Sequence, residues 1–111
     1  MSLNKLAANC YYNANSKGFW EKDKAFDPVY LATKIALIHS ECSEALEELR
    51  LIKPDAEGNY TLHWELFHEE LIDILIRTFD LLGAHIVDVD QYIEKKMQKN
   101  SKRPYKHGKN F

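Results

Sequence analysis

The sequence is poor in residues that interrupt helices, with four glycines and three prolines among its 111 residues. It also has only two cysteines, Cys10 and Cys42, and each lies beside apolar residues in a helical pattern. This placement favours buried reduced thiols over a disulfide or a metal clip. No stretch approaches the roughly 20 apolar residues of a membrane span, and the first residues lack the apolar block of a signal peptide. We therefore expect one domain, residues 1–111, that is cytoplasmic and has no membrane segment.

Acidic residues are absent from the end of the chain. From Lys95 onward there are seven basic residues and no acidic one, although the whole chain has a net charge of −2. This basic C-terminal segment, residues 95–111, is suited to hold an anion, and the acidic remainder is suited to hold cations. The alternative is a solvated basic tail, because charge blocks are commonly no more than that.

Apolar residues recur at helical spacing from the start of the chain. The first helix is expected over residues 3 to 15, behind a Ser2 cap. Asp27 followed by Pro28 combines an N-cap with the helical position that tolerates proline. The second helix should therefore start there and run to about Ile52, where a downstream proline disfavours further helix.

A third helix is expected over residues 62 to 83, and a capping-box pattern at Asp88 opens a fourth that ends at about Asn100. No strand-like alternation is present, so the predicted fold class is all-α, a bundle-like subunit of four to five helices. The third helix is apolar around most of its circumference, which predicts burial on nearly all sides. One chain of this length cannot cover it, so we expect a helical oligomer, a homodimer or homotetramer.

Carboxylates lie on both long helices. The apolar face of the second helix is expected to centre on Leu31, Ile38, Cys42 and Leu49. Glu41 and Glu48 lie at the edge of this face and Glu44 lies further out, whereas Glu70 and Asp73 interrupt the apolar surface of the third helix. Charges on a mostly buried helix are costly unless they are paired or bind a metal. Carboxylate pairs on two antiparallel neighbours can form the oxygen-rich site that Mg²⁺ or Mn²⁺ prefers.

The chain resembles the MazG-like nucleoside triphosphate pyrophosphohydrolases, an all-α superfamily that also includes the dimeric dUTPases. The resemblance rests on Glu41-x-x-Glu44 followed by Glu70-x-x-Asp73. It covers nearly the whole chain, through the segments KGFW, KIALIHSECSEALEELR, HEELIDILIRTFDLLG and EKKMQKNSKRPYKHGK. One departure is Ser40, which stands where some members have a further glutamate.

The resemblance implies hydrolysis of a nucleoside or deoxynucleoside triphosphate to the monophosphate and pyrophosphate, as nucleotide-pool housecleaning. It implies Mg²⁺ as the cofactor, with Mn²⁺ as a substitute, and Glu41, Glu44, Glu70 and Asp73 as the metal ligands. The expected catalytic residues are Glu41, Glu44 and Glu48, with Glu41 preferred as the proton acceptor and Glu48 as an orienting group or extra ligand.

The resemblance also assigns the C-terminal segment to the substrate. Lys96 and Asn100 lie one helical turn apart, and Arg103 and Tyr105 follow closely. These residues are expected to help hold the phosphates, the sugar and the base, and a triphosphate requires such positive charge. Trp20 is expected either to stack on the base or to anchor the segment between the first two helices.

Two other classes of protein fit parts of the sequence. A carboxylate-bridged di-iron bundle is suggested by Glu65-x-x-His68, but such sites take two ExxH motifs and the chain has one. A non-catalytic binding protein with a basic tail on nucleic acid is the other alternative. No nucleic-acid recognition motif accompanies the tail, so a nucleic-acid partner is not favoured.

Overall fold

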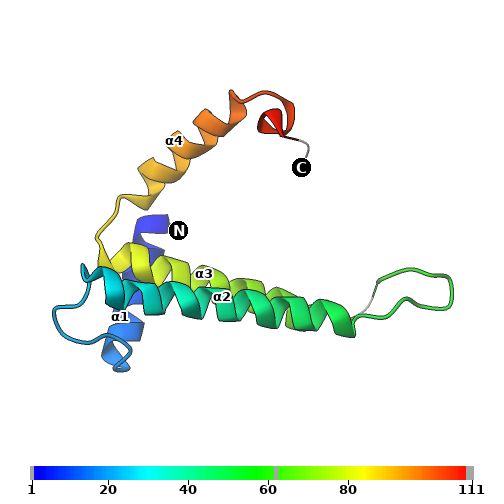
Figure 1. Cartoon of the computed structure of the whole chain (residues 1–111), viewed down its shortest axis with the longest axis horizontal. Coiled ribbons are helices and arrows are strands. Elements are labelled where there is room, and N and C mark those ends of the chain that lie inside the picture. The colour runs from blue at the N-terminus through cyan, green and yellow to red at the C-terminus, as the bar shows by residue number, and fades with distance from the viewer. Residues whose placement is uncertain (1, 62, 110–111) are drawn as a thin grey trace.

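The computed structural model describes residues 2–61 and 63–109 (Figure 1). Its elements are α1 (Leu3–Ser16), α2 (Pro28–Leu51), α3 (Glu65–Ala84), α4 (Val89–Ser101) and a short 3-10 helix, η1 (Tyr105–Gly108). The described residues form no strand, so the all-α prediction is confirmed. The third helix begins later than the expected residue 62, which lies outside the described residues.

The three predicted N-caps are confirmed. The side chain of Ser2 accepts a hydrogen bond from the Lys5 amide, and that of Asp88 accepts one from the Gln91 amide. Asp27 accepts hydrogen bonds from two amides of the first turn of α2. Amides in a first helical turn have no partner within the helix, so a side-chain oxygen at the cap stabilises this starting point.

α3 is the central helix of the body of the chain. It packs along α2, to which it runs antiparallel, and α1 crosses both near one end (Figure 1). α4 is tied to α1 through its first residues, because the Leu3 amide donates to Asp90 and the Asn4 side chain donates to Asp88. Beyond this point α4 leads away from α2 and α3. A single chain therefore packs three helices together, and the fourth stands apart from the expected bundle.

Trp20 anchors the segment between α1 and α2. Its indole Nε1 donates a hydrogen bond to Asp80 Oδ1 on α3 at 2.8 Å. Its ring contacts Tyr11 of α1 and Tyr30 of α2, with ring centroids 5.6 and 5.8 Å apart, and the Lys34 ammonium lies 4.6 Å from the ring centroid. Trp20 as a whole is 8% exposed. These contacts correspond to the anchoring role, one of the two roles predicted for Trp20.

The core of the single chain is small. The buried apolar residues among those described are Ala7, Trp20, Ala45, Ala84 and Val89. The accessible surface is 8919 Å², whereas a compact protein of this mass exposes about 6,300 Å². The radius of gyration is 17.5 Å, against about 13 Å for a compact chain of this length. The chain by itself is an extended body with an incomplete core.

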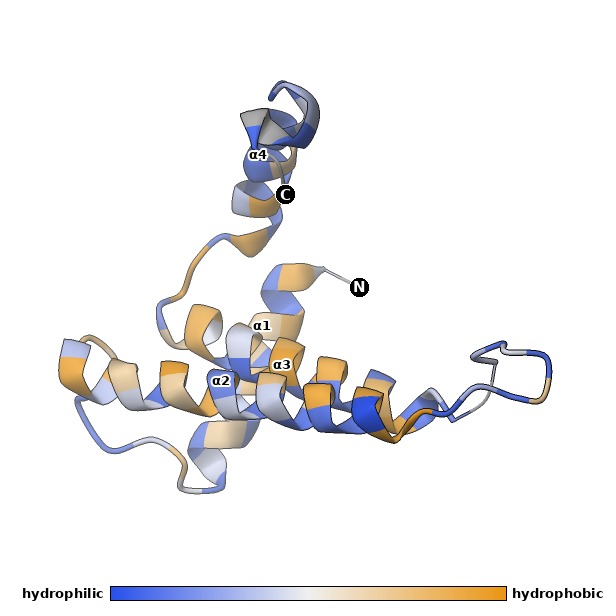
Figure 2. Cartoon of the chain, turned by 45° about the vertical axis from the view of Figure 1, so that its right-hand side comes forward, coloured by the Kyte–Doolittle hydropathy of each residue, from blue (hydrophilic) through white to orange (hydrophobic). Residues whose placement is uncertain are grey.

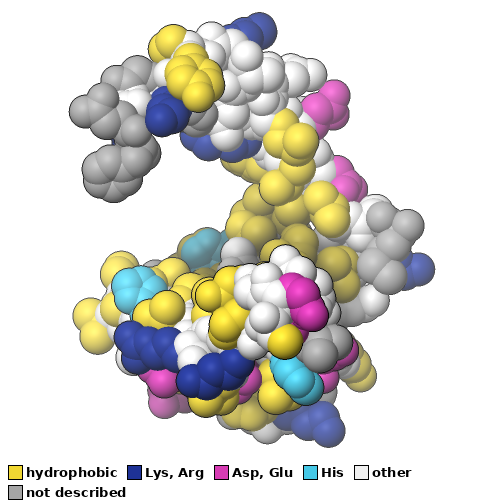
Figure 3. Space-filling view, turned by 90° about the vertical axis from the view of Figure 1, so that its right-hand side faces the viewer, with side chains coloured by type: hydrophobic (Ala, Val, Ile, Leu, Met, Phe, Trp, Pro, Cys, Tyr) yellow, Lys and Arg dark blue, Asp and Glu magenta, His cyan; other side chains and the backbone are white. Residues whose placement is uncertain are grey.

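Apolar side chains are exposed along three helices. They include Ile35, Leu46 and Leu49 of α2, Leu66, Ile72, Leu75 and Ile76 of α3, and Tyr92, Ile93 and Met97 of α4. Figure 2 shows where hydrophobic residues lie along the ribbon, and Figure 3 shows hydrophobic side chains on one face of the molecule. The single chain therefore leaves much of the third helix exposed, as expected of one chain of this length, and its burial on nearly all sides stays a prediction that depends on a partner chain. None of the helices among the described residues combines the length and the apolarity that crossing a bilayer requires.

The face that α2 turns toward α3 also differs from the prediction. Its buried residues are Glu41 and Ala45, one helical turn apart. Cys42 is exposed and Leu49 is 39% exposed, so the prediction of a buried Cys42 thiol is wrong. The physical reason is a pairing across the helices, because Arg77 of α3 bonds to Glu41. α2 therefore presents its acidic edge to α3, and its predicted apolar face is covered only in part: Leu31 and Ile38 are half-buried, whereas Cys42 and Leu49 are exposed.

Gly83 marks a close approach of α3 to α1. A Cβ at this position would lie 2.2 Å from the Ala7 carbonyl oxygen and 2.9 Å from Tyr11 Cβ. In an unhindered helix, alanine stabilises by about 1 kcal/mol relative to glycine. Gly83→Ala should instead lower the free energy of unfolding by roughly 1–3 kcal/mol, because backbone atoms must move. Urea denaturation followed by circular dichroism measures this change, and a gain in stability would contradict the packing of α1 on α3.

Candidate metal centre

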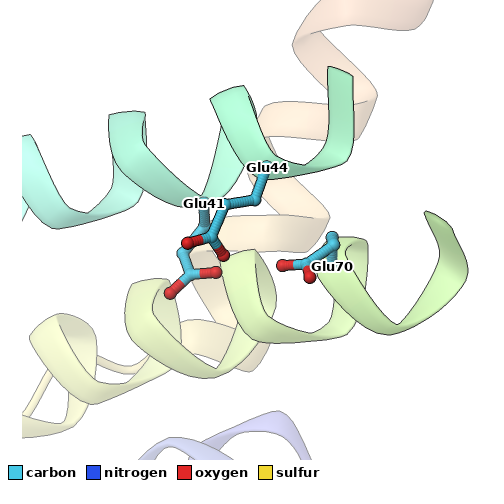
Figure 4. Close-up of side chains that lie close together, drawn as sticks. All are labelled: Glu41, Glu44 and Glu70. Atoms are coloured by element: carbon cyan, nitrogen blue, oxygen red, sulfur yellow. The ribbon is translucent and has the colours of Figure 1, made fainter. Parts of the chain in front are cut away.

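Three glutamates converge where α2 and α3 face each other (Figure 4). Glu41 and Glu44 lie on the same side of α2, as their i, i+3 spacing requires, and Glu70 comes from α3. One carboxylate oxygen of each residue lies within 4.8 Å of the other two. We call Glu41, Glu44 and Glu70 the acidic triad. The structure thus brings together three of the four predicted metal ligands.

The surroundings of the acidic triad leave two oxygens without partners. Glu41 is 8% exposed, Glu70 is half-buried and Glu44 is exposed. The Oε2 atoms of Glu41 and Glu70 are buried, and no described residue donates a hydrogen bond to either. A buried carboxylate oxygen without a partner is costly. A cation held by these oxygens would remove that cost, and oxygen ligands suit hard cations such as Mg²⁺.

Arg77 pairs with the acidic triad. Its Nε donates a hydrogen bond to Glu41 Oε1 at 2.8 Å. This contact holds the pKa of the Glu41 carboxyl below its usual range, against the opposing effect of burial. Arg77 was assigned no role from the sequence alone. The available signal was its position seven residues after Glu70, two helical turns along the same face.

The carboxyl group of Glu70 has the opposite shift. Burial and the neighbouring carboxylates, chiefly Glu44 and also Glu41 and Asp73, raise its pKa to about 7. Near neutral pH the Glu70 carboxyl therefore holds a proton about half of the time. A proton and a metal ion would compete for the same oxygens, because only the ionised carboxylate is a good ligand.

Two of the other predicted carboxylates lie outside the acidic triad. Asp73 is exposed on α3 and acts on the site through its charge, which contributes to the raised pKa of Glu70. Glu48 is half-buried on α2, one helical turn beyond Glu44. Its position on the same side of α2 leaves it beside the acidic triad.

The predicted substrate-binding residues of the C-terminal segment lie away from the acidic triad of their own chain. Lys96 and Asn100 are on α4, and Arg103 and Tyr105 follow it, where the chain leads away from α2 and α3 (Figure 1). Asn100 is half-buried, and its Oδ1 has no hydrogen-bond partner among the described residues. Trp20 is held against Asp80. The single chain therefore does not assemble the predicted nucleotide site.

The residues that suggested a di-iron site are not part of the acidic triad. Glu65 and His68 are exposed in the first turns of α3, and the His68 ring stacks with Trp64 at a centroid distance of 6.4 Å. Within the described residues, the acidic triad is the one group of three or more potential ligands, and it contains no histidine. The di-iron alternative therefore gains no support from the geometry.

The molecule thus has a carboxylate group between two antiparallel helices of an all-α chain. Comparison with protein-family models, with curated proteins and with solved structures finds no match to the chain. The chemistry of the site is therefore inferred from its own residues.

The raised pKa of Glu70 predicts a pH dependence of stability for the metal-free protein. An unfolded glutamate has a pKa near 4.3, and the folded value is about 7. Between these values the folded state binds more protons, so the free energy of unfolding should fall as pH rises from about 4.5 to about 7. Glu70→Gln removes this contribution. In EDTA, the urea midpoint of the wild type should therefore fall between pH 5 and pH 8. The midpoint of Glu70→Gln should fall less.

Glu69→Gln is the matched control for this experiment, because Glu69 is an exposed neighbour on α3 outside the acidic triad. It should keep the pH dependence of the wild type. Equal pH dependence in the wild type and in Glu70→Gln would contradict the raised pKa.

Proposed function

We propose that this chain is a Mg²⁺-dependent nucleoside triphosphate pyrophosphohydrolase of the MazG-like class, acting on aberrant or surplus nucleotides, with Mn²⁺ as a substitute ion. The main support is the convergence of Glu41, Glu44 and Glu70, with two buried carboxylate oxygens that have no hydrogen-bond partner among the described residues. The order and spacing of the two acidic motifs along the chain agree with it.

The donor atoms fit a hard divalent cation. The acidic triad offers oxygen alone, and its negative charge exceeds the single positive charge of Arg77. Glu41 Oε2, Glu70 Oε2 and one oxygen of Glu44 would hold the ion, and the exposed Asp73 is close enough in sequence to add a fourth carboxylate. When bound, Mg²⁺ neutralises phosphate oxygens and lowers the pKa of a water molecule.

Hydrolysis also needs a group that accepts the proton of the attacking water. Glu41 is poorly suited to this role, because its Oε1 is committed to Arg77 and its pKa is lowered. Glu48 is half-buried one helical turn from Glu44, and it is not one of the three grouped ligands. We therefore assign proton transfer to Glu48, in place of the Glu41 preference from sequence.

A second copy of the chain is the proposed cover for the exposed apolar faces. The chain exposes about 2,600 Å² more than a compact protein of its mass. Obligate homodimers bury roughly 2,000–5,000 Å² in total, so the excess per chain is large enough for such an interface. The exposed apolar residues on α2, α3 and α4 would form it, as a homodimer or as a pair of dimers.

The course of α4 gives the second copy a role in the site. α4, which carries Lys96 and Asn100, extends away from α2 and α3 of its own chain, and so does the segment that follows it. If these residues hold the nucleotide, the nucleotide must lie at the acidic triad of another chain. The basic segment of one copy would then meet the acidic site of its neighbour, which is the complementary arrangement of charge.

The activity is tested with a panel of canonical and modified nucleoside triphosphates, with pyrophosphate release as the readout. The wild type should release pyrophosphate from at least one of them only when Mg²⁺ or Mn²⁺ is present. Glu70→Gln should lower kcat by more than about 100-fold, because it removes an ion ligand. Glu47→Gln is the matched control, since Glu47 lies on the exposed side of α2 in a pair with Arg50. Unchanged hydrolysis in Glu70→Gln would refute the proposed site.

The subunit arrangement is tested by light scattering and by mixing variants. The wild type should be a dimer or a tetramer at micromolar concentration. Glu70→Gln and Lys96→Ala should each be impaired alone. Exchange of subunits between the two variants should restore about a quarter of the wild-type activity. About half of the dimers are then mixed, and one of the two sites in each mixed dimer has both an intact acidic triad and an intact Lys96. A monomer, or a mixture without recovered activity, would contradict a shared site.

A further inference from the structure

Arg77 has hydrogen-bonding capacity that its contact with Glu41 does not use. A guanidinium carries five N–H donors, and the Nε donor is bonded to Glu41 Oε1. The terminal nitrogens donate no hydrogen bond to any described residue, and the side chain is 39% exposed. The unused donors can therefore be reached from solvent, directly beside the acidic triad.

The neighbouring charges keep the guanidinium at this position. Arg77 bonds to Glu41, and its charge also acts on Asp80, where it offsets a part of the burial that raises the pKa of that carboxyl. Oδ1 of Asp80 is already bonded to Trp20. Arg77 thus lies between two carboxylates that attract it, while its terminal nitrogens retain unused donors.

A purely structural ion pair would explain the contact less completely. Glu41 is almost fully buried, but the side chain of Arg77 is half-buried and reaches solvent. An ion pair with Glu41 alone needs only one of the five guanidinium donors. A guanidinium can hold a carboxylate and a phosphate oxygen at the same time, because its donors point in separate directions within one plane. A lysine ammonium has no such fixed fork.

We propose that Arg77 binds a phosphate oxygen of the substrate's polyphosphate chain with its terminal nitrogens, while its Nε stays bonded to Glu41 Oε1. The inference rests on the proposed function, since it places the phosphates beside the ion that the acidic triad holds. It adds to the predicted substrate-binding residues a cation from the same chain and the same helix as Glu70.

The test separates binding of the ion from binding of the phosphate chain. Mn²⁺ affinity of the nucleotide-free protein is measured by electron paramagnetic resonance. Binding of preformed magnesium tripolyphosphate is measured by calorimetry. Arg77→Ala should weaken tripolyphosphate binding by about 10- to 100-fold, the range for losing hydrogen bonds between charged groups. Its Mn²⁺ affinity should remain within about threefold, because the three ligands remain. Arg77→Lys, which keeps the charge, should recover part of the loss.

Arg50→Ala is the matched control. It removes the same charge as Arg77→Ala, and Arg50 forms an exposed pair with Glu47 on α2. It should leave both affinities unchanged. Tripolyphosphate binding that stays within twofold in Arg77→Ala would overturn the inference and leave the metal site standing. A parallel loss of Mn²⁺ affinity would also overturn it, because Arg77 would then act only through Glu41. A wild type that binds no Mn²⁺ would overturn the proposed function as well.

Discussion

Repulsion among three carboxylates, held between two packed helices, is the constraint on which the rest of the structure depends. Glu41, Glu44 and Glu70 meet where α2 and α3 are in contact, and Glu41 is nearly buried. Like charges at such short range are unfavourable unless protons or cations reduce the charge. The chain does both in part, through the proton on Glu70 and the guanidinium of Arg77.

This constraint determines how α2 is rotated about its axis. With its acidic edge against α3, α2 buries Ala45 there, whereas its larger apolar residues Ile35, Leu46 and Leu49 stay exposed. Burial of the apolar surface and the electrostatics of the site are therefore coupled, because each depends on the same orientation of α2.

The acidic triad also depends on contacts that hold α3 in place. Gly83 lets α3 lie against the backbone of α1, and Trp20 joins α1, α2 and α3 through its ring contacts and its bond to Asp80. Carboxylates that repel each other tend to separate their helices. Close packing on the opposite side of α3 resists that separation, so a small apolar core supports a polar site.

The sequence by itself determined the helices and their caps, because capping and helical periodicity are local properties of the chain. It also determined that Glu41 and Glu44 share one side of the second helix and that Glu70 and Arg77 share one side of the third. Only the tertiary structure decided that Glu41 faces α3, that Arg77 pairs with it, that Trp20 reaches Asp80 and that α4 leads away. Periodicity shows which residues share a face, but it does not show where that face points. That direction is decided by contacts between residues that are far apart in the chain.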